Sequence, residues 1–330
     1  MTRFGRTELP EDHEPLLRRA KRLERLTLGV LVVTASLVLA VLGNSQAMKA
    51  AWAEDVLSLA PPIAFLVAVR LVNRTPDRAF PYGFHRASAV AHLVAGVALL
   101  GVGAFLVVDS GSGLLAGEHP PIGTVVVLGQ QVWLGWLMIA TMVVTSVPMV
   151  FLGRAKLALG RQLHSKVLYA DADMNKADWM TGLGTILGVA GIGAGLWWAD
   201  AVAALFISVS ILHDGYRNVR GAVSDLMDAR ATTFDDEEPD PLGEAVERYL
   251  DGLDWVEHAG TRVRDMGHVT HVEAFVVPTG DRVTTRQLER AQQRCVDLDW
   301  RLQDLVLVVV PELPEEVGGK DTERVSERNE

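Results

Sequence analysis

Acidic residues within the longest apolar region are the first candidates for chemistry. Residues 26–216 are mostly apolar, but Glu54, Asp55 and a group of charges at residues 171–178 interrupt them. An ionisable side chain inside an apolar span costs roughly 2.5–3.5 kcal/mol on insertion scales, so such residues usually serve binding or transport. Carboxylates with amide and hydroxyl oxygens form a site that hard divalent cations favour, and they can take up protons when the cation leaves.

Helical spacing sorts these residues into faces. At about 100° per residue, one helical face carries a set of oxygen and sulfur donors: Asp171, Met174, Asn175 and Asp178. Asp173 and Lys176 lie on the opposite side, three residues apart, where they can neutralise each other. In the earlier segment, Ser58 lies one turn beyond Asp55 on the same face, and Glu54 lies beside that face.

Asp55 and Asp178 are the principal candidates for a cation site. Asp55 lies fifteen residues from Arg70, and Asp178 lies twelve from Lys166. At about 1.5 Å per helical residue, these separations are roughly 22 and 18 Å, so the two acids can meet at one level. The alternative is structural: buried acids can pair with a lysine or cap a kinked helix. That structural role suits Asp171, which lies near the end of its helix. For Met174 the corresponding alternative is ordinary packing against apolar neighbours.

Six apolar segments are long enough to span a bilayer core, which needs roughly 20 residues per helix. They are residues 26–44, 47–69, 87–108, 132–152, 167–198 and 199–216, and the fourth has an alternative start at residue 122. Four arginines lie between residues 70 and 86, and four Lys or Arg lie between residues 154 and 166. The opposite loops are nearly free of them, so the positive-inside rule predicts cytosolic N- and C-termini. Residues 1–25 are charged and show no cleaved signal.

The polar C-terminal part predicts a small α+β domain. Residues 217–240 are read as a linker, residues 241–313 as the domain and residues 314–330 as a disordered tail. The predicted order is helix, strand, strand, helix, strand, over residues 242–253, 261–266, 269–277, 285–298 and 304–310. The fold class is therefore a six-helix all-α membrane domain with a small α+β C-terminal domain.

Several function classes are excluded. The single cysteine, Cys295, rules out a disulfide framework and a cysteine-based zinc site. The formal net charge of −10 and the absence of a basic patch with interleaved aromatics argue against nucleic-acid binding. No HExxH or GxSxG pattern lies in the spans, so we expect neither an enzyme nor a resident cofactor.

Three stretches carry a resemblance to the cation diffusion facilitator family. They are PDRAFPYG at residues 76–83 with Arg86 and Ala87, residues 170–178, and VSDLMD at residues 223–228. The resemblance covers nearly the whole chain apart from its two tails. It implies a homodimer of six-helix protomers in the cell (plasma) membrane, each exporting a divalent cation in exchange for protons by alternating access. It also implies a ferredoxin-like cytosolic domain that dimerises.

The chain departs from the family pattern at its expected ligands. The family places two i,i+4 ligand pairs on spans two and five; Asp55 and Asp178 match the second members, but Ala51 and Met174 occupy the first. The resemblance thus leaves Glu54, Asn175, Ser58 or Asp171 to complete the shell. An oxygen-rich shell favours Mn²⁺ or Fe²⁺ over Zn²⁺, with Co²⁺ and Cd²⁺ also open.

The same departure supports an alternative from another class: a membrane scaffold or partner subunit derived from the family that does not transport. The accessory positions depart too, since phenylalanines and valines stand where zinc-transporting relatives often carry ligands: Phe80, Phe84, Val308 and Val310. We therefore expect the C-terminal domain to dimerise rather than to sense zinc.

Overall fold

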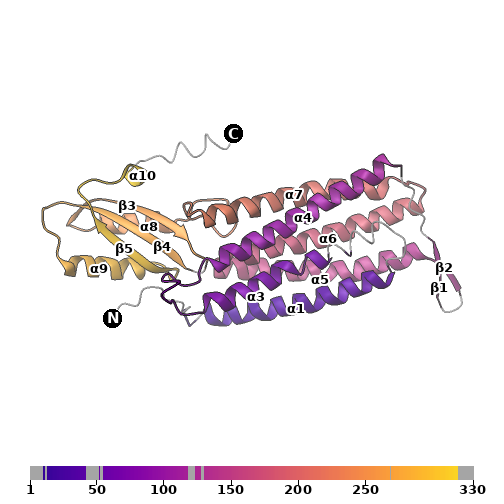
Figure 1. Cartoon of the computed structure of the whole chain (residues 1–330), viewed down its shortest axis with the longest axis horizontal. Helices are drawn as coiled ribbons and strands as arrows, with labels where there is room; N and C mark the ends of the chain where they lie inside the picture. Colours follow the sequence, from indigo (N-terminus) through magenta and orange to yellow (C-terminus); the bar gives the residue numbers. More distant parts are fainter. Residues whose placement is uncertain are drawn as a thin grey trace.

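A bundle of long helices and a small domain built on a β-sheet make up the molecule (Figure 1). The computed structural model describes residues 10–11, 13–41, 52, 55–117, 123–127, 130–267 and 269–318. The bundle is formed by α1 (His13–Val41), α3 (Ala60–Val72), α4 (Ala87–Leu115), α5 (Leu134–Leu163), α6 (Lys166–Gly193) and α7 (Ala199–Leu226). These helices run side by side along the long axis. The C-terminal domain lies at one end, and a hairpin of β1 (Thr124–Val127) and β2 (Gln130–Trp133) lies at the other.

The exterior of the bundle is apolar. In the described part of the chain, four helices are long and apolar enough to cross a membrane: His13–Ala40, Asp55–Val72, Ala87–Leu115 and Leu134–Leu163. Large apolar side chains point outward, among them Val108, Phe206 and Val209, which are 69%, 82% and 67% exposed. A surface of this kind is solvated by lipid tails rather than by water.

Helix boundaries differ from the sequence expectation at several places; α4, α5 and α7 continue to residues 115, 163 and 226 rather than ending at residues 108, 152 and 216. α1 begins at His13 rather than at residue 26, because its polar first turns continue the same helix. The alternative start of the fourth span at residue 122 is wrong, because β1 and β2 pair antiparallel there, as β-branched valines favour. α6 ends at Gly193 rather than at residue 198, just before Gly195, whose φ is 89°.

Two prolines interrupt the second span. Residues 55–57 are helical, Ser58 and Leu59 form a turn, and α3 begins at Ala60. Pro61 and Pro62 have no backbone N–H, so the carbonyls four residues earlier, at residues 57 and 58, lack their usual helical donor. The turn therefore leaves two backbone oxygen atoms without helical donors in the middle of an apolar segment.

The C-terminal domain has the predicted order of elements: α8 (Leu242–Asp251), β3 (Val256–Asp265), β4 (Thr270–Pro278), α9 (Thr285–Val296) and β5 (Leu302–Val309). β4 pairs antiparallel with β3 and parallel with β5. Alternate residues of the strands pack with α8 and α9 into one core, which includes Leu250, Val272 and Cys295. α10 (Glu315–Gly318) forms one turn inside the predicted disordered tail, and residues 319–330 lie outside the described part.

Glycines bring α4 and α7 into backbone contact. A Cβ atom built on Gly96 would lie 2.8 Å from the backbone nitrogen of Val219, and one built on Gly215 would lie 2.7 Å from Cα of Leu100. Only a residue without a side chain permits this approach. α4 and α7 therefore form a closely packed pair within the bundle.

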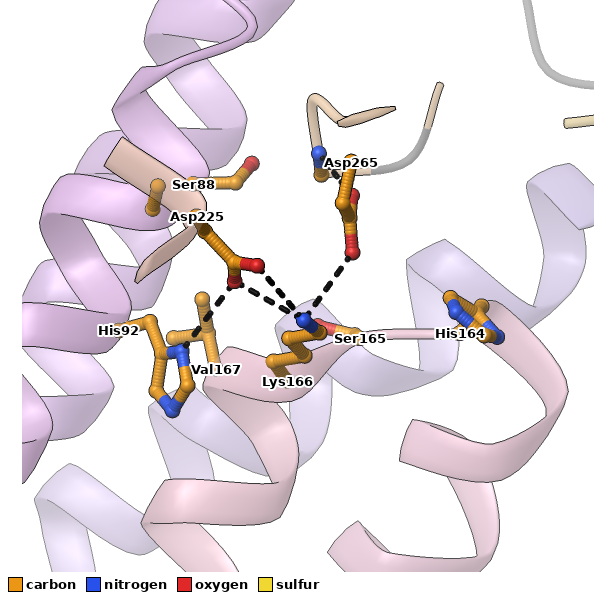
Figure 2. A pocket seen from close by; sticks show the side chains of 10 residues that line it. Ser88, His92, His164, Ser165, Lys166, Val167, Asp225 and Asp265 are labelled. Atoms are coloured by element: carbon orange, nitrogen blue, oxygen red, sulfur yellow. Dashed lines mark hydrogen bonds and ion pairs between the residues drawn. The ribbon is translucent and has the colours of Figure 1, made fainter. Parts of the chain in front are cut away.

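A buried lysine attaches the C-terminal domain to the bundle (Figure 2). Nζ of Lys166, the first residue of α6, lies 2.8 Å from Asp225 on α7, 2.6 Å from Asp236 in the connecting segment and 3.6 Å from Asp265 at the end of β3. Burial raises the pKa of Asp265, and the charge of Lys166 opposes that rise. One ammonium thus joins three segments.

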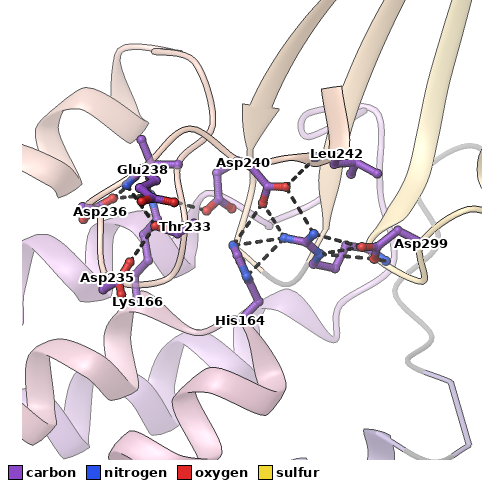
Figure 3. Close-up of polar contacts among 12 residues, drawn as sticks. His164, Lys166, Thr233, Asp235, Asp236, Glu238, Asp240, Leu242 and Asp299 are labelled. Carbon is purple, nitrogen blue, oxygen red and sulfur yellow. Dashed lines mark hydrogen bonds and ion pairs between the residues drawn. The ribbon is translucent and has the colours of Figure 1, made fainter. Parts of the chain in front are cut away.

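Arg301 makes a second attachment beside it, through three residues that Figure 3 labels: His164, Asp240 and Asp299. Its guanidinium pairs with Asp240, which precedes α8, and with Asp299 at 2.9 Å. The same group contacts the ring of His164, which follows α5. Two ionic clusters therefore hold the domain against the loops at this end of the bundle.

Candidate metal site

Asp55 and Asp178 face one small cavity inside the bundle. Its lining comes from α1, the segment before α3, α5 and α6: Val38, Asp55, Met142, Thr145, Ser146, Met149, Asp178, Thr181 and Gly182. The space open to the centre of a water-sized sphere is about 20 Å³, which is enough for one or two water-sized guests. The sequence predicts that these two acids lie at the same depth in the membrane domain, and in the structure both line the same cavity.

Both acids carry a buried oxygen that lacks a hydrogen-bond partner among the described residues. The Ser58 hydroxyl donates to Oδ1 of Asp178 at 2.6 Å, but Oδ2 of Asp178 and Oδ2 of Asp55 have no such donor. A buried carboxylate oxygen without a partner is strongly destabilising, and a cation or a proton relieves it. The orphaned oxygens therefore suit a cation held between the two carboxylates.

The rest of the cavity supplies hydroxyls. Thr145 and Ser146 on α5 and Thr181 on α6 line it together with the two acids. At the turn before Pro61 and Pro62, the Ser58 side chain reaches Asp178. The backbone carbonyls of residues 57 and 58 belong to the same turn and have no helical donor. Oxygen is thus the main donor type at this site, and Met142 and Met149 also line it.

The remaining candidates lie elsewhere or outside the described residues. Met174 packs in an apolar cluster with Leu99 and Ile207, among others, and is not part of the cavity lining. Asn175 is buried beside Gly153 of α5, and its amide nitrogen has no hydrogen-bond partner in the described part of the chain. Glu54 falls outside the described residues, as does Ala51, which occupies the position of a family ligand.

Asp171 belongs to an ion-pair cluster rather than to the cavity lining. Its carboxylate lies 2.8 Å from Nζ of Lys156 on α5, and Nζ also lies 3.3 Å from Glu24 on α1. Sequence reasoning missed this cluster, because Glu24 precedes the first expected span and Lys156 was counted among loop charges. The available signal in the sequence was the spacing of seven residues between Asp171 and Asp178, which is about two helical turns and puts both acids on one face of α6.

The predicted pairing of Asp173 with Lys176 is wrong. Asp173 accepts hydrogen bonds from Arg217 at 3.0 Å and from Asn218 at 2.9 Å, whereas Lys176 pairs with Asp214 at 2.7 Å. All three partners are on α7. A neighbouring helix satisfies both charges in better geometry than the i,i+3 contact within α6.

Within the described ranges, no three His, Cys, Asp or Glu side chains come together as ligands for one metal ion. The protein donors at the cavity are therefore two carboxylates and several hydroxyls. Such a set resembles the sites of hard cations, which accept mixed protein and water oxygens. It is unlike a closed structural zinc site, which has four nitrogen or sulfur ligands.

Comparison with known proteins places this geometry in a family. The chain is similar to the manganese efflux system protein MneS of Bacillus subtilis, at 23% identity over 264 residues, covering 80% of this chain and 84% of that protein. It is also similar to the manganese efflux system protein MneP of the same organism, at 22% identity, covering 64% and 69%. The magnetosome protein MamB of Magnetospirillum gryphiswaldense is 24% identical over about half of each chain, 51% and 52%.

The family model that matches describes the cation efflux transmembrane domain, and the match spans residues 26–227. This stretch is more than half of the 330 residues and contains both Asp55 and Asp178. The chain therefore belongs to the cation efflux family, the cation diffusion facilitators: it is a multi-pass membrane protein of a family of metal cation transporters, and not an enzyme.

Proposed function

We propose that this protein exports a divalent cation through the cavity between Asp55 and Asp178, with Mn²⁺ the first candidate. The observation that carries the proposal is the pair of buried carboxylate oxygens without hydrogen-bond partners, inside the cation efflux domain. Oxygen-dominated donors favour Mn²⁺ over softer metals. The names of the two Bacillus relatives, which specify manganese efflux, point the same way.

Protons are the proposed coupling ion. A cation that leaves the cavity removes the positive charge that neutralises Asp55 and Asp178, and in an apolar environment the carboxylates are then stabilised by protonation. Loss of the cation and uptake of protons are therefore linked at the same oxygens. Alternating access would expose the cavity first to the cytosol for loading and then to the opposite side for release.

We further propose six spans, cytosolic termini and a homodimer in the plasma membrane. α6 and α7 complete the set of spans: each has 28 residues, and their charges pair with each other. The Arg- and Lys-rich loops lie at the end of the bundle that carries the C-terminal domain, which supports its cytosolic placement. The αββαβ order of that domain supports a ferredoxin-like fold that dimerises.

The first experiment measures metal flux into proteoliposomes at an imposed pH gradient, with Mn²⁺, Fe²⁺, Co²⁺, Zn²⁺ and Cd²⁺ tested separately. We expect Mn²⁺ flux in the wild type and background flux in Asp178→Asn, which keeps the shape of the side chain but removes its charge. Asp281→Asn, at an exposed position of the C-terminal domain, is the control. Full transport by Asp178→Asn would refute the assignment.

A non-transporting scaffold or partner subunit is the second candidate. Met174 favours it, because the residue at the position of a family ligand is packed in apolar surroundings. A scaffold would bind no cation at the cavity, so equilibrium binding of Mn²⁺ separates the two functions. Absence of both binding and flux for all five metals, in a correctly folded protein, would select the scaffold.

A further inference from the structure

A lysine ammonium lies between two carboxylates in the interior of the bundle. Nζ of Lys156 is 2.8 Å from Asp171 and 3.3 Å from Glu24, and the three side chains are 1% exposed or less. They come from three helices: Glu24 from α1, Lys156 from α5 and Asp171 from α6. We call these three residues the buried triad.

The buried triad lies on the domain side of the metal cavity, at one heptad along α5 and α6 and at two along α1. Seven residues separate Lys156 from Met149 on α5 and Asp171 from Asp178 on α6. On α1, Glu24 lies fourteen residues from Val38, with Leu31 midway. Seven helical residues rise about 10.5 Å, so Asp171 and Asp178 are separated by about that distance along α6.

The layers alternate in character toward the C-terminal domain. An apolar cluster of Leu31, Met149 and Leu152 adjoins the cavity with Asp55 and Asp178, which Met149 also lines. The buried triad comes next, and an apolar cluster with Leu17 and Leu163 follows it. A cation moving along α1, α5 and α6 between the domain end and Asp178 therefore meets one charged layer.

The buried triad has one positive group for two acidic ones. Two carboxyl groups surround one ammonium, whose nitrogen contacts one oxygen of each. One ammonium neutralises one carboxylate, so the second carboxyl group either holds a proton or leaves an unfavourable negative charge in an apolar interior. A divalent cation in place of the ammonium would neutralise both carboxylates. Glu24 and Asp171 are thus arranged like the ligands of a cation, and the ammonium of Lys156 occupies the position of that cation.

We propose that Glu24 and Asp171 form a second cation site, which the transported divalent cation occupies on its way to Asp178 by displacing the ammonium of Lys156. This inference rests on the proposed function, because it takes the cavity at Asp178 as the destination. Lys156 closes the site in the absence of metal, and its two ion pairs join α1 to α6 through α5. Displacement of the ammonium breaks that connection and opens the domain side of the cavity.

Equilibrium binding of Mn²⁺ to the purified full-length protein tests the site, with metal counted per protomer. Asp178→Asn removes the transport site, and we expect no bound Mn²⁺ in this variant. Asp178→Asn with Lys156→Gln vacates the second site, and we expect one bound Mn²⁺. Adding Glu24→Gln to that pair should abolish binding again. A folded Asp178→Asn/Lys156→Gln protein that binds no metal would overturn the proposal.

A single substitution tests the same site without removing the lysine. Glu24→Gln keeps the balanced pair of Lys156 and Asp171, so this variant should fold. We expect its equilibrium affinity for Mn²⁺ at the transport site to stay unchanged while its flux falls about tenfold. Glu14→Gln, at an exposed position of the same helix, is the matched control. Wild-type flux in Glu24→Gln would show that the triad is structural only.

These measurements separate failure of this inference from failure of the proposed function. If the wild type binds Mn²⁺ and Asp178→Asn binds as well as the wild type, the transport site is misplaced. If the wild type and Asp178→Asn behave as proposed but the lysine variant binds nothing, only the second site is refuted.

Discussion

His164 shows how the junction between the two parts of the molecule constrains a single side chain. It follows α5 with φ of 47°, in the left-handed region, and its ring lies 3.1 Å from Arg301 and 3.4 Å from Asp240. Burial, together with the positive charge of Arg301, lowers the pKa of His164 to about 4. The folded protein therefore holds this ring neutral at pH values where an unfolded histidine is protonated.

Folding stability should depend on pH through His164. The folded pKa is about 4 and the ordinary value is 6.5, so between these values the unfolded state binds more protons and stability falls as pH decreases. From pH 7.5 to 5.0 the loss is about 2 kcal/mol, because the slope approaches 1.36 kcal/mol per pH unit only below the ordinary pKa. The effect becomes negligible about one pH unit above that value.

The measurement is thermal or denaturant unfolding of wild type and His164→Asn at pH 7.5 and 5.0. Asparagine tolerates the left-handed backbone at this position and does not titrate. We expect the variant to lose less stability on acidification than the wild type. Identical losses in the two proteins would contradict the assigned role of the ring.

At the residue scale, the sequence predicted the meeting of Asp55 and Asp178 but not the partners of the other charges. The meeting followed from depth along two helices, which residue counting measures. The partners of Asp173 and Lys176 are on α7, and rotation of one helix against another cannot be counted from the sequence. Glu24 and Lys156 were missed for a different reason, because the first lies before the apolar part of α1 and the second lies beyond the apolar part of α5.

At the scale of elements, the α4–α7 pair depends on glycine. A Cβ atom on Gly215 would lie 2.7 Å from both the backbone nitrogen and Cα of Leu100, whereas one on Gly101 would meet nothing within 4 Å. We expect Gly215→Ala to destabilise the bundle by about 1–3 kcal/mol, because backbone atoms cannot move aside as a flexible side chain would.

Gly101→Ala makes the same chemical change at an open position of α4 and is the matched control. Thermal unfolding in detergent, followed by tryptophan fluorescence, should show a lower Tm for Gly215→Ala and little change for Gly101→Ala. Equal midpoints for the two variants would mean that the helices do not approach as closely as described.

Hydropathy predicted where the long helices lie but not where they end. The valines at residues 125–127 are as apolar as a span, but they belong to a hairpin that is too short to cross a bilayer. α1 extends thirteen residues beyond its apolar part, because a helix can continue into polar sequence. The prolines at residues 61 and 62 could have signalled the turn at Ser58.

At the scale of the whole molecule, Lys166 holds the C-terminal domain to the bundle. Its ammonium is the shared partner of Asp225, Asp236 and Asp265. Lys166→Ala would leave three carboxylates at the junction without this cation, and removal of one partner from a buried ionic cluster costs about 3–5 kcal/mol. We expect the domain to separate from the bundle while its own sheet stays folded.

Hydrogen exchange followed by mass spectrometry measures this separation. In Lys166→Ala, exchange should increase in residues 228–241 and at the end of β3, but not in the core of β4. Arg19→Ala, at an exposed position of α1, is the control for loss of a positive charge at the same end of the molecule. Unchanged protection in the junction of Lys166→Ala would show that the remaining contacts of Arg301 and Arg86 suffice.

The size of the cavity between Asp55 and Asp178 has a consequence for hydration. A space of about 20 Å³ holds one or two waters, so an ion with a full inner shell of water does not fit. A cation must shed most of that shell before it reaches the two carboxylates. Mg²⁺ prefers the same oxygen ligands as Mn²⁺ but dehydrates reluctantly. The small cavity thus selects among ions by the free energy needed to remove their bound water, in addition to the selectivity of the ligands.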